Sequence, residues 1–243
     1  MSTLVIQVKN LSKTYENEGV ATQAVCDVSF AIEKGEFVAI MGPSGSGKST
    51  LMQMLGFLDR PSEGEYLFEG KNIQNFSDDE LAVIRNEKVG FIFQAFNLLP
   101  RTSVYENVEL PLLYDSKREK KSENDKKVLA ALKAVGIEHR VNYLSNQLSG
   151  GEKQRVAIAR ALVMDPSVIF ADEPTRNLDS KSGIQVMEIL DDLNDAGHTI
   201  ILVTHETQTA QYAKRIITMK DGGVVSDENV ENRVKLKEGD TLK

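Results

Sequence analysis

The feature that most constrains the fold is a strand-like apolar run that ends in a glycine-rich loop. Residues 37–41 read Phe-Val-Ala-Ile-Met, and the next nine read Gly-Pro-Ser-Gly-Ser-Gly-Lys-Ser-Thr. An unbroken apolar run of this length suits a strand that is buried on both faces of a parallel sheet. The following segment, 49–58, is mostly apolar and has no strand-like alternation, so it is interpreted as a helix. The sequence therefore predicts a strand–loop–helix unit in an α/β fold.

The glycine-rich loop fits the pattern G-x-x-x-x-G-K-[ST], which binds phosphates when it lies between a strand and a helix. Glycines let successive backbone N–H groups turn toward one anion, and the helix adds its N-terminal donors and its dipole. Lys48 would supply a charge for the β and γ phosphates, and Ser49 a hydroxyl for Mg²⁺. A flexible Gly/Ser linker would not explain Lys-Ser-Thr ahead of an apolar helix. The predicted nucleotide-binding residues are Gly42, Pro43, Ser44, Gly45, Ser46, Gly47, Lys48, Ser49 and Thr50.

A second apolar run, residues 168–171, ends in two adjacent carboxylates, Asp172 and Glu173. Ligands of open parallel sheets bind beyond the carboxyl ends of the strands, so this pair and the glycine-rich loop point into one crevice. Asp172 could hold Mg²⁺, through water, and Glu173 could orient or deprotonate an attacking water. By itself the pair would be interpreted as an exposed start of a loop. Beside a phosphate-binding loop, it predicts a nucleotide phosphohydrolase.

A third motif, Leu-Ser-Gly-Gly-Glu-Lys-Gln-Arg, starts at Leu148. Ser149 and Glu152 have the spacing of a capping box that opens a helix. Gly150 and Gly151 leave the first N–H groups of that helix uncovered, which suits an anion. An ordinary capped helix would explain the motif if it stood alone. In a chain that already has a γ-phosphate site, a second one has no obvious ligand unless it serves the nucleotide of another molecule.

The complete set of motifs, in order over roughly residues 3–225, resembles that of the ATP-binding cassette (ABC) ATPases. The resemblance identifies the glycine-rich loop as Walker A, Asp172–Glu173 as the Walker B end and Leu-Ser-Gly-Gly-Glu as the signature motif. It implies three further assignments. These are Tyr15 as the aromatic that stacks on adenine, Gln94 as the Q-loop glutamine that contacts Mg²⁺ or the water, and His205 as the switch histidine on the γ-phosphate. It also places Asn177–Asp179 in the D-loop, with Asp179 as its acidic residue.

The resemblance implies an ATPase that works as a pair of identical chains with Mg²⁺. Each ATP would lie between Walker A of one copy and the signature of the other, where Ser149, Gly150, Gly151 and Glu152 act in trans. Glu173, His205 and Gln94 would be the catalytic residues. The metal would be held by Ser49, Gln94 and Asp172. Hydrolysis would remove the γ-phosphate bridge and open the pair.

Several longer stretches resemble the subfamily that contains lipoprotein-releasing and macrolide-export ATPases. Those ATPases are separate cytosolic subunits that bind a membrane permease, so we expect attachment to the cytoplasmic face of the cell membrane. The resemblance implies a permease-binding groove beside Gln94, although the same residues could instead pack the helical subdomain. The stretch departs from the usual pattern at Arg101 and Ser103. The residues expected to line the groove are Phe96, Leu98, Leu99 and Tyr105.

The expected fold is a P-loop NTPase core with a mostly parallel sheet, an N-terminal antiparallel β subdomain and an inserted helical subdomain. The ABC ATP-binding domain is expected to span residues 1–226, with the helical subdomain at 96–163. A helix is predicted over 206–216, and residues 227–243 are expected to form a polar C-terminal tail. The first strands, such as 24–32, alternate apolar and polar side chains, as half-buried strands do.

Charge and length restrict the partners. The formal net charge is −7, with no basic face of the kind that binds nucleic acid, and no apolar run approaches a membrane span. A soluble ABC ATPase of translation would carry each motif twice, and one of DNA repair would carry a long coiled coil between Gln94 and Leu148. Neither feature is found. An ABC ATPase that regulates or signals through a membrane partner, without transported cargo, stays open as an alternative.

Arg176 stands in the D-loop turn, in Asp-Glu-Pro-Thr-Arg-Asn, where the resembling subfamily usually has glycine. A glycine there could reflect a positive φ or a close approach of two backbones. Three interpretations stay open for the arginine. With a negative φ it would simply project into solvent. It could instead reach across the dimer, near the partner's Walker A loop, and add a cation beside ATP, or it could be a replaced residue that weakens closure of the pair.

Overall fold

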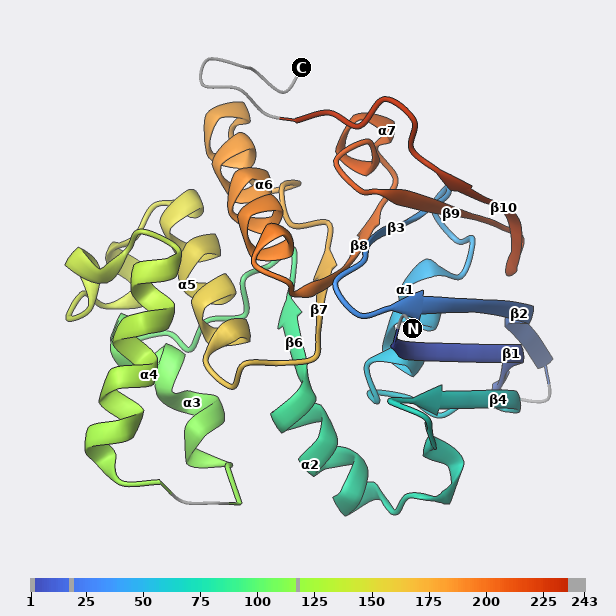
Figure 1. Ribbon diagram of the computed structural model, residues 1–243, viewed down its shortest axis with the longest axis horizontal. Coiled ribbons are helices and arrows are strands. Elements are labelled where there is room, and N and C mark those ends of the chain that lie inside the picture. Colours follow the sequence, from blue (N-terminus) through green and yellow to red (C-terminus); the bar gives the residue numbers. More distant parts are fainter. Residues whose placement is uncertain (1–2, 18–19, 117–118, 236–243) are drawn as a thin grey trace. The chain divides into compact units, whose positions relative to one another are not determined.

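The computed structural model describes residues 3–17, 20–116 and 119–235, which form two compact units (Figure 1). The first unit consists of Met1–Ala82 with Gly197–Lys235, and the second contains Val83–Ala196. The boundary between them falls within helix α2 (Asp78–Lys88). The predicted site residues are divided between the two units, so each unit is described separately.

The first unit begins with an antiparallel sheet in the order β2-β1-β4-β5. Its pairing shifts register several times. Asn10 lies at one shift and Asp27 at the next, and both residues adopt a positive φ. The Asn10 side-chain amide donates to Asp27 Oδ1 at 2.6 Å across this irregularity. The bulge keeps Val25 and Val28, three positions apart, on the buried face. The strands are β1 (Leu4–Asn17), β2 (Val20–Glu33), β4 (Glu63–Phe68) and β5 (Lys71–Asn72).

The same unit also holds the strand that leads into the glycine-rich loop. This strand, β3, is buried and runs parallel to β8 and β9, while β10 is antiparallel to β9. All side chains of β8 are buried, as the unbroken apolar run predicts. The elements are β3 (Phe37–Met41), α1 (Lys48–Leu55), η1 (Ile73–Asn75), β8 (Thr199–Thr204), α7 (Thr207–Ala210), β9 (Arg215–Lys220) and β10 (Gly223–Asn229).

The second unit combines a parallel strand pair with helices. β6 and β7 run parallel, and α3, α4 and α5 pack on one another (Figure 1). The apolar faces of these helices supply fully buried side chains such as Val108, Leu132 and Ile158. The elements are β6 (Val89–Ile92), α3 (Val104–Leu113), α4 (Lys121–Ala134), η2 (Glu138–Arg140), η3 (Ser145–Gln147), α5 (Gly150–Leu162), β7 (Val168–Asp172) and α6 (Ser180–Asp195).

The predicted fold class is confirmed, with its antiparallel β part, its parallel strands and its helical part. The helix predicted over 206–216 is wrong beyond Ala210, because Arg215 already pairs with β3 as the first residue of β9. Sheet pairing thus overrides the local helical pattern. In the described part of the chain, no helix is long and apolar enough to cross a membrane.

The segment expected to be a polar tail begins inside strand β10, which continues to Asn229. Beyond the strand, Val230 N donates to Lys214 O at 2.9 Å and Val234 N donates to Gln211 O at 3.1 Å. Residues 227–235 therefore have backbone contacts within the first unit. Residues 236–243 lie outside the described part of the chain.

Candidate functional site

The glycine-rich loop connects β3 to α1, as the sequence predicts. Gly47 precedes the helix with φ +96°, and a Cβ atom built on it would lie 2.4 Å from Ala24 O. At Gly42 the corresponding Cβ would lie 2.2 Å from Met219 O. Only glycine avoids both the strained φ and the collision, so the backbone of β2 and of β9 fixes the path of the loop.

Lys48 opens α1 and turns back over the loop. Its side chain is 8% exposed, and its ammonium donates to Gly42 O at 2.7 Å and to Pro43 O at 2.8 Å. Among the described residues, no side chain caps the N-terminus of α1. Backbone donors, a helix dipole and an ammonium therefore converge at this helix start, which is the donor set that suits a polyphosphate.

The remaining loop residues differ in exposure. Ser44, Gly45 and Ser49 are exposed and Thr50 is half-buried. The Ser46 side chain is buried, and its Oγ has no hydrogen-bond partner within the described residues. An unpartnered buried hydroxyl in a loop of this kind fits a loop whose polar groups are completed by a bound anion.

His205 lies beside this loop. In the parallel pair β3–β8, Met41 is opposite Thr204, so the chain leaves both strands at the same edge. Gly42 follows one strand and the exposed His205 follows the other. Within the first unit the structure thus brings the predicted switch histidine next to the predicted phosphate loop.

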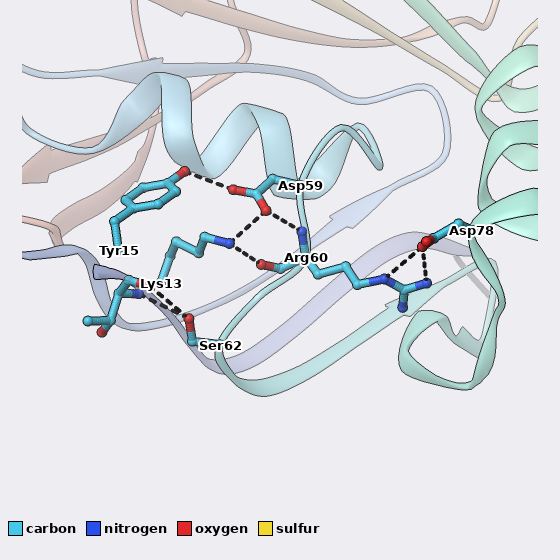
Figure 2. A network of polar contacts seen from close by, with 7 residues as sticks. Lys13, Tyr15, Asp59, Arg60, Ser62 and Asp78 are labelled. Carbon is cyan, nitrogen blue, oxygen red and sulfur yellow. Dashed lines mark hydrogen bonds and ion pairs between the residues drawn. The ribbon is translucent and has the colours of Figure 1, made fainter. Parts of the chain in front are cut away.

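Tyr15 also belongs to the first unit, on strand β1, with a half-buried side chain. Its hydroxyl donates to Asp59 Oδ2 at 2.8 Å, and the same carboxylate receives the Lys13 ammonium at 2.6 Å (Figure 2). The predicted adenine-stacking ring is therefore held by two side chains that the sequence did not single out.

The second unit repeats the strand-edge arrangement with β6 and β7. Ile92 pairs with Ala171, so Gln94 and the Asp172–Glu173 pair follow their strands at the same edge. The Asp172 side chain is half-buried, whereas Glu173 is only 9% exposed and has φ +45°. Positive φ is uncommon for a glutamate, and strain of this kind is concentrated at functional sites.

Two reciprocal hydrogen bonds connect the Q-loop to the D-loop. The Asn177 amide donates to Gln94 O at 3.0 Å, and the Gln94 amide donates to Asn177 Oδ1 at 3.4 Å. Asp179 ends the D-loop as the N-cap of α6, where it accepts from Ser182 N at 3.0 Å and from Ser182 Oγ at 2.7 Å. These hydrogen bonds lower the pKa of Asp179 below its ordinary value.

The signature motif forms the capping box that the sequence predicts. Ser149 Oγ accepts from Glu152 N at 3.3 Å, and Glu152 accepts from Ser149 N at 2.9 Å. Arg140 adds a charged contact, because its Nε lies 2.9 Å from Glu152 Oε1 while its guanidinium stacks on the Tyr143 ring. The hydrogen bonds from Ser149 and the pairing with Arg140 hold the pKa of Glu152 below its ordinary value, against the opposing effect of burial.

The stretch predicted to meet a permease follows Gln94 in a tight loop. Phe96 and Asn97 both have positive φ, and their carbonyls accept from the Arg160 guanidinium at 2.9 and 2.5 Å. Of the predicted lining residues, Leu99 is exposed and Phe96 and Leu98 are half-buried. Arg160 comes from α5, so the signature helix itself supports this loop.

The other members of this stretch serve local structure. The Tyr105 hydroxyl donates to Asp125 Oδ1 at 2.5 Å, which ties α3 to α4. Ser103 is the N-cap of α3 in a second capping box with Glu106, a role that serine and threonine share. Arg101 adopts φ +64°.

Arg176 lies in the turn between β7 and α6. Its N–H donates to Glu173 O at 3.2 Å, its side chain is exposed, and it is not one of the residues with positive φ. The turn therefore does not require a glycine on conformational grounds at this position. An arginine fits it with its side chain projecting outward.

Sequence reasoning missed four residues that position the predicted ones. Each is far in sequence from the group that it contacts, and no local pattern marks such pairs. The only signal that could have pointed to them in the sequence is that they are cations or carboxylates. The residues are Lys13, Asp59, Arg140 and Arg160.

Comparison with known proteins identifies the family. The family described as ABC transporter matches residues 25–176. The macrolide export ATP-binding/permease protein MacB of Bdellovibrio bacteriovorus is 50% identical over 227 residues, which are 93% of this chain and 34% of MacB. The chain thus spans about a third of the length of its MacB relatives. An ABC transporter ATP-binding protein of Methanocaldococcus jannaschii, MJ1508, is 48% identical over 91% of this chain and 98% of its own length.

Solved structures agree with these sequences. The ATP-binding cassette MJ0796 of M. jannaschii, in a dimeric post-hydrolysis state bound to ADP and Pi, has a TM-score of 0.85 and 45% identity to this chain. The alignment covers 93% of this chain and 99% of that one. The predicted resemblance to the macrolide-export type is confirmed by the identity to the ATP-binding part of MacB. The chain belongs to the ABC transporter family, as an ATP-hydrolysing ATP-binding cassette.

Proposed function

We propose that this chain is the nucleotide-binding subunit of an ABC transporter, and that ATP-driven pairing of two copies powers a separate membrane permease. The observation that carries the proposal is the start of α1, where Lys48 folds over the loop at a helix N-terminus without a side-chain cap among the described residues. That arrangement supplies backbone donors and a positive charge to a polyphosphate. The curated relatives and the solved cassettes support the same function.

In the proposed chemistry the first unit binds the substrate. The loop N–H groups and Lys48 hold the β and γ phosphates, and the Tyr15 ring stacks on the adenine. His205 contacts the γ-phosphate, which is supported by its place beside Gly42 at the common edge of β3 and β8. The Ser49 hydroxyl, the Gln94 amide and Asp172 would hold Mg²⁺, which neutralises charge on the phosphates.

The second unit supplies the groups for hydrolysis. Glu173 orients and deprotonates the attacking water, and Gln94 senses the γ-phosphate. The buried position and positive φ of Glu173 support this role, because strained backbone of this kind is concentrated at functional sites. The reciprocal hydrogen bonds between Gln94 and Asn177 would transmit a change at the Q-loop to the D-loop.

The proposed active form is a pair of chains. Ser149, Gly150, Gly151 and Glu152 of one copy would complete the ATP site of the other. The dimeric solved structures of MJ0796 support this arrangement, one of them with ADP and Pi bound. Hydrolysis cuts the γ-phosphate bridge between the two copies, and the pair opens once the phosphate leaves.

The proposed partner is a permease on a separate chain, with this chain attached to the cytoplasmic face of the membrane through it. MacB relatives are described as ATP-binding/permease proteins, and MJ1508, of which the match covers 98%, is described as an ABC transporter ATP-binding protein. The proposed cargo is a macrolide-like drug, a lipoprotein or a peptide. The exposed Leu99 and the Phe96 loop held by Arg160 are the proposed contact surface.

The test of the catalytic part is Glu173→Gln. We expect ATP turnover to fall at least about 100-fold, as for loss of a general base, while ATP still binds and a dimer accumulates. Turnover is measured by phosphate release and the dimer by analytical ultracentrifugation, with and without ATP. The matched control is Glu138→Gln, the same change at an exposed position. Near-normal turnover in Glu173→Gln would contradict the assignment, and a stable dimer without nucleotide would contradict the ATP-driven pairing.

The test of the transport part uses the membrane protein that co-purifies with this chain. Reconstituted together in vesicles, the two proteins should move cargo in an ATP-dependent manner. ATP turnover without any cargo movement would favour a regulator that signals through its membrane partner. Co-purification of ribosomes or DNA instead of a membrane protein would contradict the transporter proposal.

A further inference from the structure

The ring of Tyr15 is held by a group of charged side chains that extends to the segment directly after α1 (Figure 2). Lys13 and Tyr15 are two positions apart on β1, so their side chains share one face of the strand. Both reach Asp59, whose two carboxylate oxygens are used separately. Oδ1 accepts from Lys13 at 2.6 Å and Oδ2 accepts from the Tyr15 hydroxyl at 2.8 Å.

Asp59 is itself fixed to α1, the helix that begins at the phosphate loop. The backbone N–H groups of Leu58 and Asp59 donate to Gln53 O at 2.8 and 3.2 Å, directly after the helix ends. The next residue is anchored as well, because Arg60 donates from Nη2 to Asp78 Oδ1 and to Phe76 O, both at 2.8 Å. The carboxylate that holds the Tyr15 ring thus has a fixed position relative to the helix that starts at Lys48.

Lys13 constrains the ring in a second way. Its ammonium lies 4.9 Å from the centroid of the Tyr15 ring and also donates to Arg60 O at 2.8 Å. The cation occupies one face of the ring, so a flat ligand would stack on the opposite face. The side chain of Lys13 is only 12% exposed and that of Asp59 27%, which limits screening of the pair by solvent.

The ionisation of the group is stable near neutral pH. Burial raises the pKa of Tyr15, and the hydrogen bond to Asp59 raises it further. Burial by itself would raise the pKa of Asp59, but the hydrogen bonds from Lys13 and Tyr15 bring it below its ordinary value. Tyr15 therefore stays a neutral donor and Asp59 a charged acceptor, and the hydrogen bond between them persists.

We propose that Lys13 and Asp59 are positioning residues for Tyr15, which hold its ring in the one orientation that stacks on the base of the bound nucleotide. The pair does not need to touch the nucleotide. It fixes the ring before the base arrives, so that binding does not have to order a free aromatic side chain. It also sets the position of the ring relative to the phosphate loop, through α1. This inference rests on the proposed function, in which the nucleotide is ATP.

The test compares two ligands that share phosphates and differ in the base. Asp59→Ala in the full chain is expected to raise the Kd for ATP about tenfold, the scale of losing a stacked ring, and to leave the Kd for inorganic triphosphate within about twofold. In steady-state assays the KM for ATP should rise far more than kcat falls. The matched control is Asp79→Ala, the same change at an exposed position on α2 outside this group. It should change neither Kd by more than about twofold.

A double variant separates positioning of Tyr15 from other effects of Asp59. If Asp59 acts through the ring, Asp59→Ala with Tyr15→Leu should bind ATP no more weakly than Tyr15→Leu alone. Fully additive losses, equal losses for ATP and triphosphate, or an unchanged Kd for ATP would each overturn the inference. Should Asp59→Ala fail to fold, Lys13→Met removes the ammonium while keeping the aliphatic stem, and the same three outcomes apply. A wild-type chain that binds neither ligand would instead overturn the proposed function.

Discussion

Two helices of this chain, α1 and α5, begin at a glycine-rich motif, but their N-termini are stabilised in different ways. α5 has a local device, the capping box of Ser149 and Glu152, which Arg140 reinforces. α1 has no side-chain cap among the described residues, and it begins after a glycine in the left-handed region, Gly47. A helix start leaves several N–H donors without partners. α5 satisfies part of that demand from its own sequence, whereas at α1 the proposed function assigns it to the phosphates of the nucleotide.

The difference shows that two glycine-rich motifs can start a helix in two ways. The loop before α1 keeps its shape through distant contacts, since Gly47 approaches the carbonyl of Ala24 and Lys48 spans the loop. The start of α5 has a cap from its own sequence in addition to a distant contact, since a Cβ atom on Gly151 would lie 2.8 Å from Ser182 Oγ. In the proposed function α1 binds the nucleotide of its own chain and α5 that of the partner, so a site ready before the partner arrives suits α5.

The largest difference between the two helices is expected when the glycine at each helix N-terminus is replaced by alanine. Gly47→Ala places a Cβ where Ala24 O lies 2.4 Å away and forces a left-handed φ, so we expect a loss of more than about 2 kcal/mol in unfolding free energy. ATP binding should be lost with it. Gly150→Ala places its Cβ 3.4 Å from Leu178 Cδ2, an ordinary contact, and alanine favours helix.

The unfolding free energy of both variants is measured by urea denaturation, with circular dichroism as the signal. Gly150→Ala should be at least as stable as the wild type and should still bind ATP as a monomer. Its turnover should nevertheless fall, because the proposed trans contact depends on an open backbone. Equal stability of the two variants would remove the distinction between a start held by distant contacts and one held locally.

Replacing the serine at each helix N-terminus by alanine should give a smaller difference in stability. Ser149→Ala removes the N-cap hydroxyl of α5 and should cost about 1 kcal/mol of unfolding free energy. Ser49→Ala, at the exposed second residue of α1, removes no cap and should change stability by less than about 0.5 kcal/mol. Its effect should appear as a higher Mg²⁺ concentration for half-maximal ATP turnover. A stability loss at Ser49 as large as that at Ser149 would mean that α1 has a side-chain cap after all.

The contrast also separates what the sequence could predict from what it could not. The capping box of Ser149 and Glu152 and the strand–loop–helix around Lys48 are local patterns, so they were predictable. The contacts of Asp59 with Tyr15 and of Asn177 with Gln94 join segments far apart in the chain. No spacing marks such pairs, because the fold alone decides which distant side chains meet.

Tertiary pairing also corrected two local interpretations. The pattern over 206–216 is helical, yet Arg215 opens a strand because β3 offers it a parallel partner. The polar residues after 226 suggested a tail, yet β9 pairs with them as far as Asn229. Arg176 shows the opposite case, in which the unusual residue needed no unusual backbone.

The smallest expected effect is the change in stability of the two helix N-termini in acid. Hydrogen bonds from Ser149 lower the pKa of Glu152 from an ordinary value of 4.5, and Arg140 adds to this. A carboxylate with a lowered pKa in the folded state contributes stability above its ordinary pKa, and that contribution is lost as the pH falls through the lowered value. α1 has no acidic residue in its first turn, so it contributes nothing in this range. Acid should therefore weaken α5 and leave α1 unaffected.

Glu152→Gln tests this, because glutamine can complete a capping box without titrating. Its unfolding free energy should fall less steeply than that of the wild type between about pH 5 and pH 3, measured by urea denaturation at each pH. Glu106→Gln, in the matching capping box of α3, should flatten the curve in the same direction, since Ser103 lowers the pKa of Glu106. Glu228→Gln, at an exposed position on β10, is the control. Parallel curves for the wild type and Glu152→Gln would show that the α5 start does not depend on this charge, and the two helix starts would then differ in hydrogen bonding alone.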